Sequence, residues 1–465
     1  MMKRISIVTV AVLVLLAPLA LPAGPKDVKL PPYTEHTLKN GLKVFVMETK
    51  EVPLVTVRLL VPAGSAHDPS GSEGIANLTG RLLMKGAGGW SAEEISETVD
   101  GIGGRLSADP GRDFTLVAGD FMSRDLETAL DLLATVVMDP EFLAEEIERE
   151  RGIVLAEIQS TKERPSSIAT REALRELFGE HPYAHPVSGS QASVSGIARG
   201  DIVDFHRRRF VPPGSILAVV GDVEATKALK AIRERFGSWR GEAAAGTGVD
   251  ELAMEHLEGR RVLVIDKPDA TQSQIRFGNI AVGRNTPDYF PLLVANNILG
   301  GGFTSRLVDE IRVNRGLTYG VGSFMVYLRH GGLFGVYTFT KNATLRETID
   351  VALAEVERIR SEEVGSEELE KSKRYLSGLF PFELETNDDL ARWLTELAFY
   401  GLDKSVVEKY RTKTGEVNTG DVRRVAQKYF HADGCVIVLL TNYNEVKDQL
   451  EGLGSIEVVS IDDLE

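Results

Sequence analysis

Eight histidines and one cysteine are the residues of this chain best suited to bind a metal ion or to act as a catalytic base or nucleophile. No two histidines have the spacing H-x-x-E-H, which on a helix would place two imidazoles around a zinc ion with a glutamate as general base. His181 and His185 are close in sequence, but a proline follows each of them and favours an extended or turn backbone. The histidines therefore do not predict a metal site.

Other common catalytic motifs are missing from the sequence as well. There is no G-x-S-x-G turn for a serine nucleophile. The run Gly300-Gly301-Gly302 lacks the Lys-Ser/Thr ending of a phosphate-binding loop, so it does not predict nucleotide binding. Cys435 precedes the apolar run Val-Ile-Val-Leu-Leu, and we interpret its thiol as part of a buried core.

The segment from Arg312 to Tyr319 carries two residue types that can act on a peptide. A guanidinium can hold a carbonyl or carboxylate, and a phenol can donate to the oxyanion of a tetrahedral intermediate. The spacing alone favours a structural interpretation, in which Arg312 pairs with Asp309 or Glu310 on an exposed helix and Tyr319 is buried in a strand.

The chain that positions these residues repeats itself. Residues 201–222 can be laid over residues 421–442 at an offset of about 220, and each segment has the pattern of a helix, a turn with glycine and a buried strand. A second overlay, at nearly the same offset, places Arg58 opposite Arg276. The sequence therefore predicts two homologous halves produced by internal duplication.

Each half has strands and helices in separate blocks. Alternating apolar residues predict strands at 42–46 and 54–61, and Ser91 with Glu94 predicts a capping box at a helix start. Long charged helices are predicted at roughly 123–137, 140–164 and 168–180. This order favours an α+β fold of two domains, each a mainly antiparallel sheet covered by helices.

The first 23 residues have the pattern of a secretory signal peptide, with a basic start, an apolar run and the small residue Ala23 at its end. We expect a periplasmic or extracytoplasmic protein that is soluble after cleavage and contacts the membrane only if residues 1–23 remain as an anchor. The predicted boundaries are a first domain at 30–240, a Gly- and Ala-rich linker at 241–251 and a second domain at 252–465. The formal net charge of −15 argues against a nucleic-acid partner.

Several segments in order resemble the pitrilysin/insulinase family of zinc peptidases, in particular its short two-domain bacterial members and the mitochondrial processing peptidase subunits. These segments read GLKVFVME, GIANLTGRLLMKG, ERERGIVLAEIQ, HPYAHPVSG, DFHRRRFVPPGSILAVVGDV and NNILGGGFTSRLVDEIRVNRGLTYGV. The resemblance covers nearly the whole mature chain. It implies that the two domains form half of a clamshell.

The family's zinc motif is degenerate in this sequence. The slot of H-x-x-E-H falls on residues 77–81, where Asn77 and Arg81 replace the two histidines and Gly80 replaces the general base. The family's third ligand, a glutamate about 76 residues later, is retained as Glu157. A lone carboxylate cannot reproduce a His₂Glu site, so we predict no metal in this chain.

The resemblance gives a function to residues of the second half. In the family an arginine and a tyrosine at the positions of Arg312 and Tyr319 reach the active-site cavity and hold the substrate near the cut bond, which reverses the structural interpretation. The backbone of residues 300–302 offers a surface along which a substrate adds as a strand, or else it is a helix-ending turn.

A lost zinc motif with a retained Arg/Tyr pair is the pattern of the non-catalytic subunit in two-subunit members of the family. We therefore expect a pseudoenzyme that forms a heterodimer with a zinc-bearing sister subunit and contributes Arg312 and Tyr319 in trans to peptide cleavage. Zinc is expected in the partner only. The alternatives are a structural or assembly protein with the same fold and a free-standing peptide-binding module.

Overall fold

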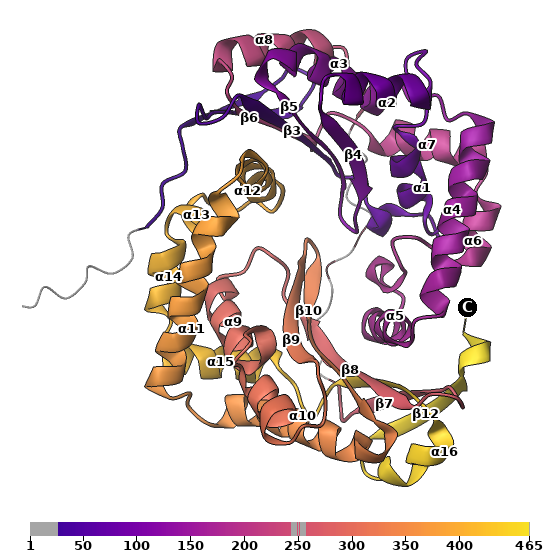
Figure 1. Ribbon diagram of the computed structural model, residues 1–465, viewed down its shortest axis with the longest axis vertical. Coiled ribbons are helices and arrows are strands. Elements are labelled where there is room, and N and C mark those ends of the chain that lie inside the picture. The colour runs from indigo at the N-terminus through magenta and orange to yellow at the C-terminus, as the bar shows by residue number, and fades with distance from the viewer. Residues whose placement is uncertain (1–26, 243–248, 250, 252–256, 465) are drawn as a thin grey trace, which may run out of the picture.

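The computed structural model describes residues 27–242, 249, 251 and 257–464. The predicted signal peptide at 1–23 and most of the predicted linker at 241–251 lie outside these residues. Two six-stranded sheets with helices form the two halves of the molecule (Figure 1). The α+β fold class is thereby confirmed.

The first sheet has the order β1-β2-β6-β3-β5-β4, and only β2 and β6 pair in parallel. The second has the order β12-β7-β11-β8-β10-β9, with β7 parallel to both β11 and β12. In chain order the strands are β1 (Tyr33–Thr37), β2 (Lys43–Glu48), β3 (Leu54–Val61), β4 (Arg105–Pro110), β5 (Thr115–Met122), β6 (Ile216–Gly221), β7 (Arg261–Asp266), β8 (Gln272–Ala281), β9 (Val321–Leu328), β10 (Gly331–Lys341), β11 (Val436–Thr441) and β12 (Ser455–Ser460). Both sheets are mainly antiparallel, as predicted.

The helices of the first half are α1 (Ile75–Leu82), α2 (Ala92–Gly101), α3 (Leu126–Met138), α4 (Ala144–Lys162), α5 (Pro165–Phe178), α6 (Gln191–Gly196), α7 (Arg199–Arg209) and α8 (Ala225–Phe236). Those of the second half are α9 (Tyr289–Asn296), α10 (Leu345–Ser361), α11 (Ser366–Leu379), α12 (Asn387–Phe399), α13 (Ser405–Glu408), α14 (Tyr410–Glu416), α15 (Thr419–Tyr429) and α16 (Tyr443–Val446). Within the described part of the chain, no helix is long and apolar enough to cross a membrane.

Local sequence signals explain where several helices begin. Ser91 and Glu94 form the predicted capping box at the start of α2. Thr386 and Asp389 form another at the start of α12. Helix α5 begins with Pro165, whose fixed φ suits the first helical position.

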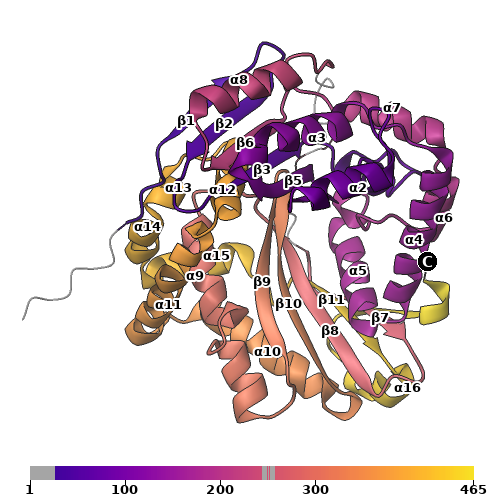
Figure 2. The same cartoon turned by 45° about the horizontal axis from the view of Figure 1, so that its top comes forward.

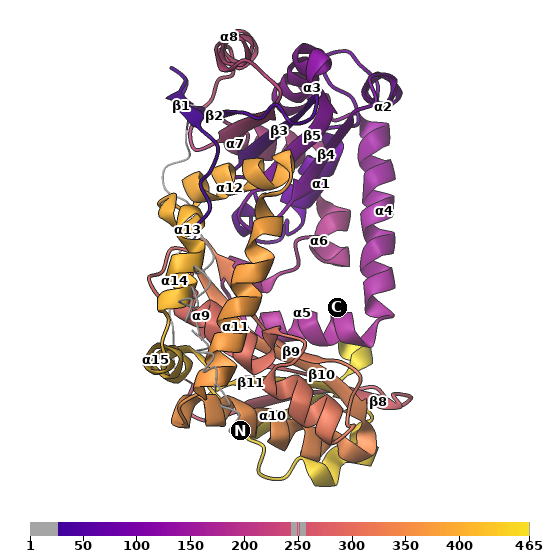
Figure 3. The ribbon, with the colours of Figure 1, turned by 60° about the vertical axis from the view of Figure 1, so that its left-hand side comes forward.

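The two halves exchange a helix. Helix α12 of the second half packs on β3 and β6 of the first sheet, and α5 of the first half packs on β8 and β11 of the second sheet. Figure 3 shows α12 against the upper sheet and α5 against the lower one, and Figure 2 shows α5 beside β8 and β11 from another side.

The alternation of side chains along each strand explains why both faces of the sheets need a cover. In β2, Val44 and Val46 belong to the core beneath the first half's own helices. Phe45 and Met47 point the other way, into a core shared with α12 residues such as Leu394. In the second sheet, residues such as Val438 share a smaller core with α5. The exchange therefore joins the hydrophobic cores of the two halves.

The arginines that the sequence overlay matched, Arg58 and Arg276, hold the exchanged helices. Arg58 Nη1 lies 2.8 Å from an oxygen of Asp388, in the first turn of α12. Arg276 donates from Nε to Thr170 Oγ1 (3.0 Å) and from Nη2 to the carbonyl of Ser166 (3.3 Å), both at the start of α5. Equivalent residues thus perform equivalent packing roles in the two halves.

Leu394→Ala should destabilise both halves together, because Leu394 is only 1% exposed and belongs to the shared core. The expected loss in the free energy of unfolding is about 2–5 kcal/mol. Urea unfolding followed by circular dichroism measures it. Leu379→Ala, at a leucine that is 45% exposed, is the control and should change stability little. If one half of the Leu394→Ala variant still unfolds at the same urea concentration as in the wild type, the shared core is contradicted.

Candidate functional site

Helix α1 carries the degenerate zinc motif and packs against β4, α4 and α7. The carboxylate of Asp68 accepts hydrogen bonds from the backbone N–H groups of Gly74 (2.7 Å) and Ala76 (3.0 Å). Gly74 itself has a positive φ of 96°, a conformation that glycine adopts readily. These contacts fix the start of α1 and therefore the direction in which Asn77, Gly80 and Arg81 lie.

The guanidinium of Arg81 bridges two carboxylates of α4. Its Nε donates to Glu150 (3.0 Å), and its Nη1 and Nη2 donate to the two oxygens of Glu157 (3.1 and 3.0 Å). Lys85, one turn further along, also lies 3.1 Å from Glu150. We call Arg81, Lys85, Glu150 and Glu157 the ion cluster.

The ion cluster holds its charges firmly. Burial favours the neutral form of Glu150, but hydrogen bonds from Arg81 and Lys85 outweigh burial and hold the pKa of Glu150 below its ordinary value. Burial likewise opposes the charge of Arg81, and its hydrogen bonds to Glu150 and Glu157 outweigh this and raise the pKa of Arg81. The Arg81 side chain therefore stays positively charged and stabilises the carboxylates of the ion cluster.

The residues at the motif do not fit a catalytic zinc ion. Both imidazoles are replaced, and the Arg81 guanidinium occupies the oxygens of Glu157, the one retained donor. At Gly80, a Cβ atom would lie 2.4 Å from Cγ of Pro110 in β4. A glutamate at the general-base position would therefore clash with Pro110.

Sequence reasoning missed two members of the ion cluster, Lys85 and Glu150, and of these Glu150 has the more informative spacing. It precedes Glu157 by seven residues, which on a helix places the two side chains on one face, two turns apart. That spacing is the signal that could have identified it. Arg81 is long enough to reach both.

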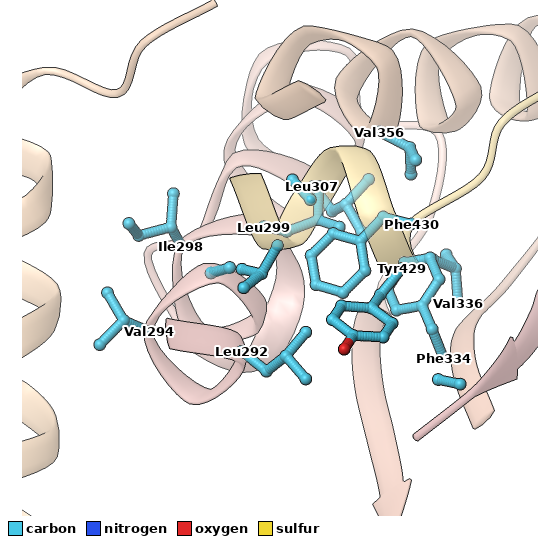
Figure 4. Close-up of a cluster of buried hydrophobic side chains, with 14 of the residues drawn as sticks. Leu292, Val294, Ile298, Leu299, Leu307, Phe334, Val336, Val356, Tyr429 and Phe430 are labelled. Atoms are coloured by element: carbon cyan, nitrogen blue, oxygen red, sulfur yellow. The ribbon is translucent and has the colours of Figure 1, made fainter. Parts of the chain in front are cut away.

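The loop that leads to Arg312 is anchored on both sides. A helical turn at Asn297–Gly301 continues α9, and Leu299 and Leu307 on either side of the loop are buried in the core around Phe430 (Figure 4). Arg306 makes two hydrogen bonds of 2.8 Å to the carboxylate of Glu368 on α11. The loop is thus held by the core and by an ion pair.

The three glycines end this helical turn. Gly300 is buried, and a Cβ atom there would lie 2.4 Å from the backbone nitrogen of Ser323 in β9. Gly301 is exposed, and Gly302 lines a cavity of 610 Å³ between the loop and α11. Only the last two glycines of the predicted substrate surface thus lie where a ligand could approach.

Arg312 and Tyr319 both face the solvent. Arg312 follows the buried Ile311, and its guanidinium lies 5.2 Å from the centre of the Phe303 ring. Neither Asp309 nor Glu310 pairs with it, and no other ion pair of Arg312 occurs among the described residues. The structural interpretation is therefore wrong about the pairing of Arg312, although the residue does lie on an exposed helical segment, Val308–Asn314.

Tyr319 is 86% exposed rather than part of a strand core. The backbone on either side of it is held by β10, because Thr340 donates to the carbonyl of Leu317 (2.8 Å) and Thr338 donates to that of Gly320 (3.0 Å). The phenol thus extends from a fixed backbone, and its hydroxyl can meet a molecule that approaches from outside.

Comparisons with known proteins agree with this architecture. Residues 43–191 match the family described as insulinase (peptidase family M16), and residues 196–376 match the peptidase M16 inactive domain. A protein named as an uncharacterized zinc protease of Mycobacterium leprae is 30% identical over 363 residues, which cover 78% of this chain and 80% of the relative. A similarly named protein of Bacillus subtilis is 25% identical over 88% of this chain and 98% of its own.

Solved structures match as well. A peptidase M16 inactive-domain protein from Pseudomonas fluorescens has a TM-score of 0.82 and 27% identity, over 88% of this chain and 98% of that one. A protease from Helicobacter pylori shares the fold, with a TM-score of 0.81 and 23% identity over 89% of this chain and 100% of that one. The predicted resemblance is confirmed, and the chain belongs to the insulinase family of peptidases, M16.

Proposed function

We propose that this chain is the non-catalytic subunit of a zinc peptidase and supplies Arg312 and Tyr319 to the active site of a zinc-bearing sister chain. The observation that carries the proposal is the ion cluster, in which Arg81 engages Glu157, the one retained carboxylate that a metal ion would need. A chain with this arrangement lacks the means to activate water for peptide cleavage. Its exposed Arg312 and Tyr319 can still bind the substrate and stabilise the oxyanion.

The two side chains have separate roles in the proposed complex. Zinc in the sister chain would supply the activated water. The Arg312 guanidinium binds a backbone carbonyl or a carboxylate of the peptide, and Phe303 beside it limits its movement. The Tyr319 hydroxyl donates a hydrogen bond to the oxyanion as it develops.

The proposal includes a heterodimer and an exported location. A predicted signal segment at residues 1–23 supports export. The sister is proposed from the same family because proteins similar to this chain are named as zinc proteases. A structural role or a free-standing peptide-binding role would use the same fold without a contribution to hydrolysis. The mutations below separate these functions.

Arg81→Ala should lower the free energy of unfolding by about 1.5–3 kcal/mol at pH 7, because it removes charged hydrogen bonds from the buried Glu150. The pKa of Glu150 is depressed in the folded chain, so this stabilisation is complete above its unfolded value and is lost as the pH falls through the folded one. Urea unfolding at pH 7 and at acid pH measures both effects. Arg124→Ala, at a side chain that is 75% exposed, is the control. An equal loss at both pH values would contradict the assigned ion cluster.

Purified wild-type chain should hold less than one zinc ion after dialysis, as elemental analysis can determine. The triple change Asn77→His, Gly80→Glu, Arg81→His should not restore a full site, because a side chain at position 80 clashes with Pro110 and displaces α1, which carries both new histidines. Adding Pro110→Ala should raise the zinc content above that of the triple variant. One tightly held zinc per wild-type chain, lost on Glu157→Ala, would overturn the proposal.

Arg312→Ala or Tyr319→Phe should slow peptide cleavage by the complex with the sister chain by about 100- to 1000-fold in kcat. Light scattering should show that the heterodimer still forms. A rise in KM alone would instead mark ground-state binding of the peptide. Arg315→Ala is the nearby control, because Arg315 directly follows the helical segment of Arg312 but lies near Glu310 and Glu347. If both variants assemble and cleave like wild type, the chain is a scaffold.

A further inference from the structure

A second site lies where the two halves meet. A cavity of 410 Å³ is lined by Arg112, Arg171 and Arg276 and by the hydroxyl-bearing Ser166, Ser167 and Thr170 of α5. Arg112 comes from the turn between β4 and β5, and Arg276 comes from β8, so both halves contribute. No described residue that lines this cavity carries a carboxylate.

Two of the three arginines form no ion pair among the described residues. Arg171 pairs with Glu172 at 2.7 Å. Arg112 donates to the carbonyl of His185 (2.9 Å), and neither it nor Arg276 forms an ion pair with any residue that the structure describes. Both arginines are partly buried, and burial lowers the pKa of each. Tyr183 and Asp113 oppose this shift at Arg112, and Tyr337 opposes it at Arg276, but none of them outweighs burial.

The other half of the molecule shows what is missing. Arg58 has the same place as Arg276, and Asp388 in the first turn of α12 neutralises it at 2.8 Å. Helix α5 offers Arg276 only neutral acceptors, the hydroxyl of Thr170 (3.0 Å) and the backbone carbonyl of Ser166 (3.3 Å). Its Nη1 donates to the carbonyls of Ile275 (2.9 Å) and Thr338 (3.2 Å), which carry no net charge either. The arginine is therefore present on both sheets, as Arg58 and Arg276, but only Arg58 has a carboxylate partner, Asp388.

We propose that this cavity binds a carboxylate of a peptide, either an acidic side chain or the terminal carboxyl group, between Arg112 and Arg276. Planar guanidinium groups bind carboxylates through charged hydrogen bonds, and Arg276 still has one N–H of Nη2 to give, because its Nε and Nη1 donate within the chain. The hydroxyl of Ser167 adds a neutral donor, whereas that of Thr170 already donates to the carbonyl of Ser166 (2.9 Å). A neighbouring cavity of 340 Å³ shares Arg171, Ala184 and Pro186 with this one. It gives room for the residues that flank the carboxylate. The choice of a peptide as the ligand rests on the proposed function.

Three fluorescent ten-residue peptides of otherwise identical sequence test the proposal by anisotropy with the full chain alone. The first has a central Glu and a terminal amide, the second a central Gln and a terminal amide, and the third a central Gln and a free terminal carboxyl group. Wild type should bind the first or the third at least about 10-fold more tightly than the second, because charged hydrogen bonds are the stronger ones. Which of the two is favoured identifies the source of the carboxylate.

Ser166→Asp should abolish this preference, because it supplies in α5 the counter-ion that Asp388 supplies in α12. Ser166→Asn is the matched control of similar size without the charge and should keep the preference. Ser166 is exposed at a helix start, where aspartate is well tolerated, and circular dichroism verifies folding. Arg276→Gln should also remove the preference.

Equal or undetectable binding of the three peptides by wild type would overturn the carboxylate site, and so would equal losses in Ser166→Asp and Ser166→Asn. Arg315→Ala should leave the preference unchanged, because Arg315 belongs to neither proposed site and lies near Glu310 and Glu347. The two proposals can therefore fail separately, because one is read from cleavage by the complex and the other from binding to this chain.

Discussion

Each sheet of this molecule has two apolar faces, and its own half covers only one of them. The second face is covered by a helix of the other half, α12 on the first sheet and α5 on the second. A sheet left open on one side would expose the side chains of alternate residues along every central strand. The relative placement of the two halves, and of every site at their junction, depends on this exchange.

The fold class and the internal duplication could be predicted from the sequence because both rest on local patterns. The alternation of apolar residues, the capping box at Ser91 and the repeated helix-turn-strand unit are visible within short windows. The exchange of α5 and α12 is not visible there, because it depends on contacts between residues far apart in the chain. The sequence overlay matched Arg58 with Arg276, but only the structure shows that each holds an exchanged helix.

Only part of the degenerate zinc motif could be predicted from the sequence, for a similar reason. The replacements at Asn77, Gly80 and Arg81 follow from the sequence once the family pattern is recognised. The pairing of Arg81 with Glu150 depends on how α1 and α4 pack. Pro110 lies beside Gly80 because β4 packs on α1, and the sequence does not show that closeness. The exposure of Arg312 and Tyr319 was likewise decided by packing, which buries Ile311 and holds the backbone around Tyr319.

The helix exchange also affects the chain while it is being made. The first sheet is complete once β6 ends at Gly221, but α12 begins only at Asn387. At the usual rates of synthesis, the ribosome needs roughly 10–30 s to add the residues between them. During that time Phe45, Met47 and their neighbours on that face have no cover from this chain. This face of the first sheet therefore acquires its cover only after α12 has been synthesised, late in translation.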